Sequence, residues 1–228
     1  MEAIKNLVHV AVRPSKSFEW VRENPNWWTP LILLVITLVV FTAISAPLAM
    51  ELGQKEMLKR SADMSPGELA QAKQIMGSPI FIVMAMISAV IALAFAVLIQ
   101  SSLLHLGASA FGGRASFAVG VATVVYAQVP IILQQIIQSI YMSASGNIIK
   151  PGLSTILPGS KASPALTALL GRIDIFSIWS IILLIIGFSI TYKISKGKAA
   201  TIAIGYWSIA TIFAVTLAAI GGAFTPPA

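Results

Sequence analysis

The feature of this chain that most constrains its fold is a long stretch almost free of charge. Between Gln74 and Ile149 the sole formally charged side chain is Arg114. Two apolar runs, Pro79–Leu106 and Phe117–Tyr141, lie on either side of it. Each run is longer than the ~20 residues that an α-helix needs to cross a hydrocarbon core about 30 Å thick. The stretch therefore predicts a transmembrane hairpin with Arg114 at its tip.

Composition agrees with a membrane location and excludes several other classes of protein. Hydrophobic residues make up 57% of the chain and charged residues 10%, whereas soluble domains carry roughly 25% charged residues. The chain has no cysteine, which excludes disulfides, thiolate nucleophiles and cysteine-ligated metals. The net charge is +7, but the basic residues are scattered among the loops that flank the apolar runs. Membrane spans explain that pattern better than a phosphate-tracking groove, so nucleic acid is not an expected partner.

Hydropathy along the chain predicts an all-α integral membrane protein in a single domain, residues 1–228. The expected fold is a bundle of five transmembrane helices with an N-terminal amphipathic, interfacial helix in residues 1–29. The expected spans are residues 31–50, 79–105, 117–141, 173–194 and 200–222. Pro47 is expected to kink or end the first span. The capping box that begins at Ser65 predicts a short helix over Pro66–Met76.

The N-terminal segment has the pattern of two short amphipathic helices. Pro14 restarts the helix, because proline lacks an N–H and suits a first helical turn. Phe18 then belongs to a second apolar patch. Two interpretations stay open: the segment lies in the headgroup plane, or it covers the loops of the bundle. The apolar positions of the first helix are Ile4, Leu7, Val8 and Ala11.

Residues that flank the spans indicate the orientation of the chain. Trp27 and Trp28, just before Pro30, lie where the aromatic belt of a bilayer is expected. Five spans place the two termini on opposite sides of the membrane. The basic N-terminal segment and the short basic turn Lys193–Lys198 favour a cytoplasmic N-terminus and a C-terminus outside.

Several amides lie inside the predicted spans, where each needs a partner. Span two ends with Gln100 and His105, and span three contains Pro130, which frees the carbonyl of Tyr126. One hypothesis is a solute pathway that joins Gln100, Gln128, Gln135 and Asp174. The other is that the amides hold helices together, paired with Gln100, Ser102 or His105, at ~0.6 kcal/mol per bond. Helix association is the favoured interpretation. The amides of span three are Gln128, Gln134, Gln135 and Gln138.

Two further places carry alternative interpretations. Gly112, Gly113 and Arg114 form either an anion-binding nest or a tight glycine turn with a cationic anchor, and turn chemistry favours the turn. Asp174 is either a proton or cation carrier, or a structural residue that pairs with Arg172 or stabilises a helix N-terminus. The structural role is favoured, because an acid at the interface costs little.

Rows of small residues predict which faces of two spans meet other helices, since small side chains let backbones approach closely. In span two the row is Ser88, Ala92 and Ala96, and in span five it is Ala210, Ala214, Ala218 and Gly222. The neighbouring Ile209, Ile212 and Phe213 are expected to face lipid.

The sequence contains no pattern typical of an enzyme. The histidines, His9 and His105, lie on separate segments, and no hydrolase, nucleotide-binding or metalloprotease motif is found. We therefore expect no catalytic residue, no metal site and no cofactor.

Three stretches resemble a known family in order and over nearly the whole chain. The resemblance is to the YIP family of Ypt/Rab-interacting membrane proteins, in its compact, prokaryotic-like form without a long cytosolic N-terminal region. It implies a five-span bundle with a cytosolic N-terminus, and eukaryotic members are linked to Rab GTPases, vesicle traffic and membrane shaping. The stretches are Pro14-x-x-x-Phe18 with Trp27-Trp28-Thr29-Pro30; Phe111-Gly-Gly-Arg-Ala-Ser-Phe117 through Tyr126-Ala-Gln-Val-Pro130; and Asp174-Ile-Phe-Ser-Ile-Trp179 through Gly187, then Gly197-Lys-Ala-Ala200.

Two functional hypotheses follow from these observations. The first is a noncatalytic multi-span protein that organises membrane or recruits partners through its N-terminal segment and loops. The alternative is a small transporter, channel or lipid-moving protein with an amide-lined interior. The expected partners are membrane lipids, a protein bound by the N-terminal segment or loops, and a second copy of the chain.

Overall fold

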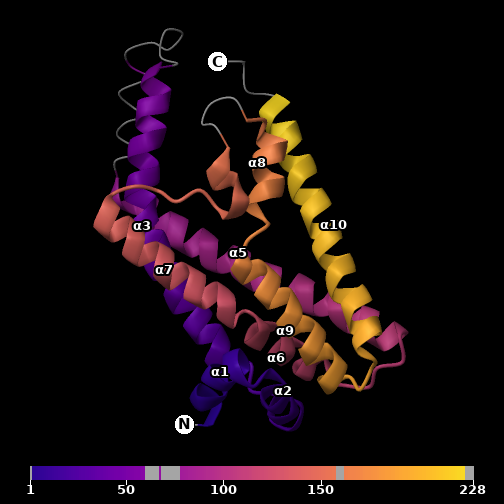
Figure 1. Cartoon of the computed structure of the whole chain (residues 1–228). Helices are drawn as coiled ribbons and strands as arrows, with labels where there is room; N and C mark the ends of the chain where they lie inside the picture. The colour runs from indigo at the N-terminus through magenta and orange to yellow at the C-terminus, as the bar shows by residue number, and fades with distance from the viewer. Residues whose placement is uncertain (1, 60–66, 68–77, 158–161, 224–228) are drawn as a thin grey trace. The chain divides into compact units, whose positions relative to one another are not determined.

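The computed structural model describes residues 2–59, 67, 78–157 and 162–223, and these form helices and connecting turns without any strand. The all-α fold class is therefore confirmed (Figure 1). The helix expected over Pro66–Met76 lies outside the described residues except for Gly67. The helices are α1 (Glu2–Val12), α2 (Pro14–Glu23), α3 (Trp28–Lys59), α5 (Pro79–Ala110), α6 (Phe117–Ala127), α7 (Val129–Ser145), the 3-10 turn η2 (Gly152–Ile156), α8 (Pro164–Gly171), α9 (Ile175–Thr191) and α10 (Lys196–Ala223).

Four stretches among the described residues are long and apolar enough to cross a membrane: Trp28–Lys55, Pro79–Ala110, Phe117–Ser145 and Lys196–Gly221. The expected fourth span, residues 173–194, contains one helix, α9, and begins at the bend that precedes this helix. Helix α9 has 17 residues, and with α8 it forms a pair bent by 54° that makes a fifth span when both are counted together. The bend arises because Asp174 caps α9 and begins a new helix there.

The helix continues through the proline of span one, but it is interrupted just before the proline of span three. Helix α3 continues through Pro47 to Lys59, so Pro47 does not end the span; the loss of one hydrogen bond is tolerated inside a long apolar helix. In span three, the chain breaks at Gln128, which separates α6 from α7. Pro130 lies in the first turn of α7, a position that suits a residue without an N–H.

The described chain divides into two compact units, which we call unit 1 and unit 2. Unit 1 contains residues 1–32, 96–131 and 150–228, and unit 2 contains residues 33–95 and 132–149. Within unit 1, α2 packs against α6 and α9, α1 packs against α2 and α6, and α10 packs against α8 and α9 (Figure 1). Helix α6 is buried at every position from Val119 to Ala127. An apolar helix buried on all sides forms the centre of a core.

Unit 2 is built differently, from α7, the larger part of α3 and the first half of α5. Many of its large apolar side chains are exposed, among them Ile36, Val40, Ile80, Met84, Ile87 and Ile91. Such a surface is unfavourable in water, but it matches the hydrocarbon of a bilayer.

The two rows of small residues have opposite outcomes. On α10, Ala214 is half-buried while Ile212 and Phe213 are 65% and 70% exposed, which confirms the expected faces. On α5, Ser88, Ala92 and Ala96 are all exposed, so no described helix packs on that row. Small residues permit close approach but do not drive it.

Candidate functional site

The N-terminal helices are fixed on the spans of unit 1 by a large aromatic side chain. Pro14 occupies the first turn of α2, and Phe18, one turn later, is fully buried. A Cβ at Gly187 of α9 would lie 2.9 Å from Phe18 Cε1 and 2.7 Å from Thr123 Cγ2. Phe18 and Thr123 therefore occupy the space that a side chain at position 187 would need. The structure brings together two predicted residues, Phe18 and Gly187, from opposite ends of the sequence.

A buried polar contact joins α1 to α2 beside this aromatic contact. Ser17 Oγ donates to Asn6 Oδ1 at 2.6 Å, and both residues are buried. Tyr126 is completely buried, and its ring packs edge-on against Trp20 of α2 with centroids 6.4 Å apart. Neither Asn6 nor Ser17 was singled out from the sequence, because a buried polar pair between two short helices has no signature in spacing. Together these contacts make the helix pair part of the core and not a loose segment.

The aromatic residues before the first span form a stacked pair. The rings of Trp27 and Trp28 lie 3.7 Å apart, and Trp28 is 59% exposed. Asn26 Oδ1 accepts hydrogen bonds from the backbone N–H and the hydroxyl of Thr29. Pro30 is buried in the first turn of α3. This arrangement begins the helix and leaves one indole available to an interface.

The backbone N–H groups of the glycine turn after α5 donate to backbone carbonyls of the protein. Gly113 N donates to Ala108 O at 2.9 Å, and Gly112 N donates to Ser109 O at 2.9 Å. Gly112 has a φ of +87°, which completes the Schellman pattern of a helix C-terminus. Arg114 N donates to Tyr192 O at 3.2 Å. Because all three N–H groups are used, the geometry is that of the tight turn and not of an anion-binding nest.

Tyr192 of the α9 C-terminus organises the same end of unit 1. Its hydroxyl lies 2.6 Å from His105 Nδ1, and its ring stacks on Phe188 with centroids 5.0 Å apart. A Cβ at Gly120 would lie 2.5 Å from the Tyr192 hydroxyl, and one at Gly113 would lie 2.9 Å from Tyr192 Cβ. Tyr192 was missed at the sequence level, because nothing in its local pattern sets it apart from other interfacial tyrosines.

Two of the four amides of span three, Gln128 and Gln135, have hydrogen-bond partners within their own units. In unit 1, Gln128 Nε2 donates to Gln100 Oε1 at 3.0 Å, and Gln100 was among its expected partners. In unit 2, Thr37 Oγ1 donates to Gln135 Oε1 at 2.8 Å. The Thr37 partner was not expected, because Thr37 lies 98 residues earlier in the chain. Gln134 and Gln138 are half-buried.

Asp174 is the N-cap of helix α9. Its Oδ1 accepts hydrogen bonds from Phe176 N at 2.8 Å and Ser177 N at 3.0 Å, the geometry of an N-cap. Arg172 does not pair with it and instead donates from Nε to Thr211 Oγ1 at 3.0 Å. Trp179, one turn into α9, packs half-buried against the core of unit 1. Of the two interpretations of Asp174, these contacts match the structural one.

No cluster of three or more histidine, cysteine, aspartate or glutamate side chains suited to a metal exists among the described residues. A helical multi-span membrane protein, with its N-terminal helices packed on the spans, is the class that these features define.

The Yip1 domain model matches residues 8–218, so the chain belongs to the Yip1 domain family. This confirms the resemblance seen in the sequence. No curated protein and no solved structure matches the chain.

Proposed function

We propose that this Yip1-family protein is noncatalytic and organises the bilayer through its N-terminal helix pair, which the spans hold at the membrane interface. The observation that carries the proposal is the outward face of α1. Ile4, Val8 and Val12 follow one another at i+4 spacing and are 62%, 64% and 70% exposed. They form an apolar row that the core of unit 1 does not use.

A basic row lies beside this apolar row. Lys5, His9 and Arg13 have the same i+4 spacing, one residue further along, and all three are exposed. The opposite face of α1 is anchored by Leu7 and Val10, which are buried. A helix with an exposed apolar row and flanking cations suits the headgroup boundary of an anionic leaflet. Because the helix is docked, its insertion would be transmitted to the spans.

The alternative of a solute conduit has less support. Gln128 and Gln135, the amides that would act as ligands, each have a hydrogen-bond partner within their own unit. Asp174 is occupied by backbone amides. A pathway would need these groups free and wetted. The same contacts are those of side chains that hold helices together.

The orientation that accompanies this proposal has a cytoplasmic N-terminus, where anionic lipids are concentrated. If α8 and α9 together make a fifth span, the C-terminus lies outside. Reporter tags on the two ends are then accessible from opposite faces. Labelling of both tags from one face would contradict the five-span topology.

The chain has no cysteine, so a spin label on one introduced cysteine reports a single position. We expect a spin label at Val8→Cys to be reached by oxygen and shielded from a water-soluble relaxant in anionic bilayers. The matched control is Glu19→Cys on α2, an exposed position outside the apolar row, which should behave as water-exposed. Equal water exposure at both positions would overturn the proposal.

A further inference from the structure

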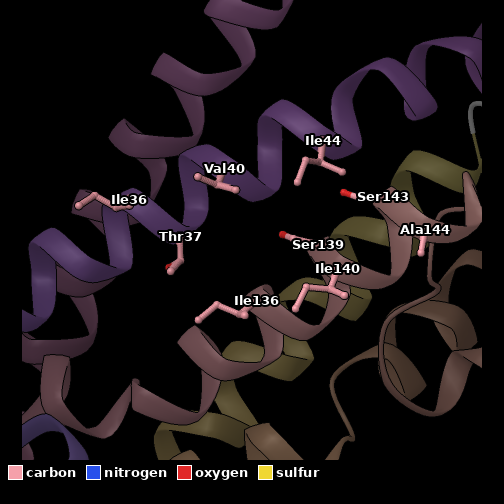
Figure 2. A pocket seen from close by; sticks show the side chains of 9 residues that line it. All are labelled: Ile36, Thr37, Val40, Ile44, Ile136, Ser139, Ile140, Ser143 and Ala144. Atoms are coloured by element: carbon pink, nitrogen blue, oxygen red, sulfur yellow. The ribbon is translucent and has the colours of Figure 1, made fainter.

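Unit 2 contains a cavity of about 610 Å³ between α3 and α7, shown in Figure 2. Its walls are branched aliphatic side chains: Ile36, Val40 and Ile44 on α3, and Ile136 and Ile140 on α7. Small-molecule sites are typically ~300–1,000 Å³ and largely apolar. The cavity therefore has the size and lining of a site for an apolar ligand.

The Ser139 hydroxyl lines this cavity. Ser139 is 7% exposed, and its hydroxyl is directed into the space between the two helices in Figure 2. No hydrogen bond joins it to any other described residue, whereas Thr42 Oγ1 donates to Leu38 O in its own helix. The hydroxyl oxygen is accessible from the cavity and can donate to an acceptor there. A ligand that carries such an acceptor would give this hydroxyl a partner.

The charges of the lining restrict what the ligand can be. None of the residues that line the cavity carries a charge, so an ionised phosphate or ammonium group would have no counter-charge there. The wall residues Ile36, Val40 and Ile140 are 53%, 47% and 65% exposed. Because unit 2 presents apolar faces of this kind to the hydrocarbon, a ligand can enter sideways from the bilayer.

We propose that the cavity binds one acyl chain of a membrane glycerolipid, with the Ser139 hydroxyl donating to the ester carbonyl of that chain. The branched walls hold the hydrocarbon, and the charged headgroup stays outside. The ester carbonyl is the acceptor that a neutral, uncharged lining can accommodate. This site is independent of the α1 surface, since the two lie in different units.

The test compares two lipid probes that differ by one acceptor. The full chain in bilayers is crosslinked with a phosphatidylcholine that carries a diazirine on its acyl chain, in an ester-linked and an ether-linked form. We expect labelling to concentrate on the α3 and α7 peptides of the cavity. Ser139→Ala should lower labelling by the ester lipid by about threefold, the factor that corresponds to ~0.6 kcal/mol for one hydrogen bond in a membrane. Labelling by the ether lipid, which lacks the carbonyl, should not change.

A second variant tests occupancy without relying on the hydroxyl. Ile140→Trp fills the cavity and should lower labelling there by about tenfold, as overpacking of a site does. The matched control is Ile137→Trp, an exposed α7 position outside the lining, which should label like the unmodified protein. Equal labelling of all exposed apolar positions, with no effect of either cavity variant, would show bulk lipid contact and overturn the proposal. Crosslinks between two copies at this cavity in place of lipid adducts would overturn it as well.

Discussion

Units 1 and 2 have similar apolar composition but pack in different ways. In unit 1, glycines stand where helices meet large aromatic side chains: Gly187 beside Phe18, and Gly120 and Gly113 beside Tyr192. In unit 2, α3 and α7 face each other with isoleucine and valine, and a cavity of about 610 Å³ remains between them. Branched side chains on both helices keep the backbones apart, whereas a glycine lets a ring fill the gap. The placement of small residues therefore decides whether a pair of apolar helices forms a core or a groove.

The largest effect should come from filling the glycine contact of unit 1. Gly187→Leu places its side chain where Phe18 and Thr123 already lie, 2.7–3.0 Å from a Cβ at that position. We expect the free energy of unfolding to fall by about 3 kcal/mol, the upper part of the range for overpacking. The measurement is thermal or denaturant unfolding in detergent micelles.

Gly205→Leu is the control, because Gly205 is on α10 and a Cβ there meets nothing within 4 Å. It should change stability by less than about 0.5 kcal/mol. If the two leucine variants are equally stable, the close contact at Gly187 does not contribute to the stability of unit 1.

The next effect concerns the outer helix of unit 1. Ala214→Leu enlarges a half-buried residue on the packed face of α10, so the free energy of unfolding should fall by about 1–3 kcal/mol. Phe213→Leu alters a side chain that is 70% exposed and should have little effect. A neutral Ala214→Leu together with a severe Phe213→Leu would reverse the assignment of the faces.

The amide pairs allow a comparison across the two units. Gln128→Leu removes the bond to Gln100 in unit 1, and Gln135→Leu removes the bond from Thr37 in unit 2. Each should change the free energy of unfolding by about 0.5–2 kcal/mol. Neither variant should cause a specific transport defect in vesicles, and a solute-selective defect without loss of stability would support the conduit alternative.

Asp174 gives a smaller effect with a clear chemical signature. Asp174→Ala removes the N-cap of α9 and should lower stability by about 1 kcal/mol, whereas Asp174→Asn, another good cap, should cost only a few tenths. A proton or cation carrier requires an ionisable carboxyl. In that case both substitutions would abolish proton or cation transport equally, while the free energy of unfolding stayed unchanged.

Much of this fold follows from the sequence, because hydropathy and length alone define helices that cross a bilayer. The contact of Phe18 with Gly187 lies between residues that the family resemblance had singled out, and Gln100 was expected as a partner of Gln128. Span four was expected from residue 173, and α9 begins at Ile175 with Asp174 as its N-cap. The short helix α8 that precedes it was not predicted.

Contacts that depend on three-dimensional fit were not predictable. Thr37 is one of many hydroxyls in the other spans, and its separation of 98 residues from Gln135 along the chain does not single it out as the partner. Tyr192 and Asn6 act through partners on other helices. The cavity at Ser139 depends on the volumes of side chains on two helices, which no periodicity encodes.

The accessibility of Gln128 and Gln135 to water tests most directly whether this protein is a noncatalytic bundle or a conduit. In an otherwise cysteine-free chain, Gln128→Cys and Gln135→Cys are treated with a membrane-impermeant thiol reagent in folded protein. Glu19→Cys, an exposed position, gives the rate for a water-accessible thiol. The account predicts that both span positions react far more slowly than position 19, because paired amides in hydrocarbon are dry. Rapid modification at both 128 and 135 would contradict it and establish a hydrated path.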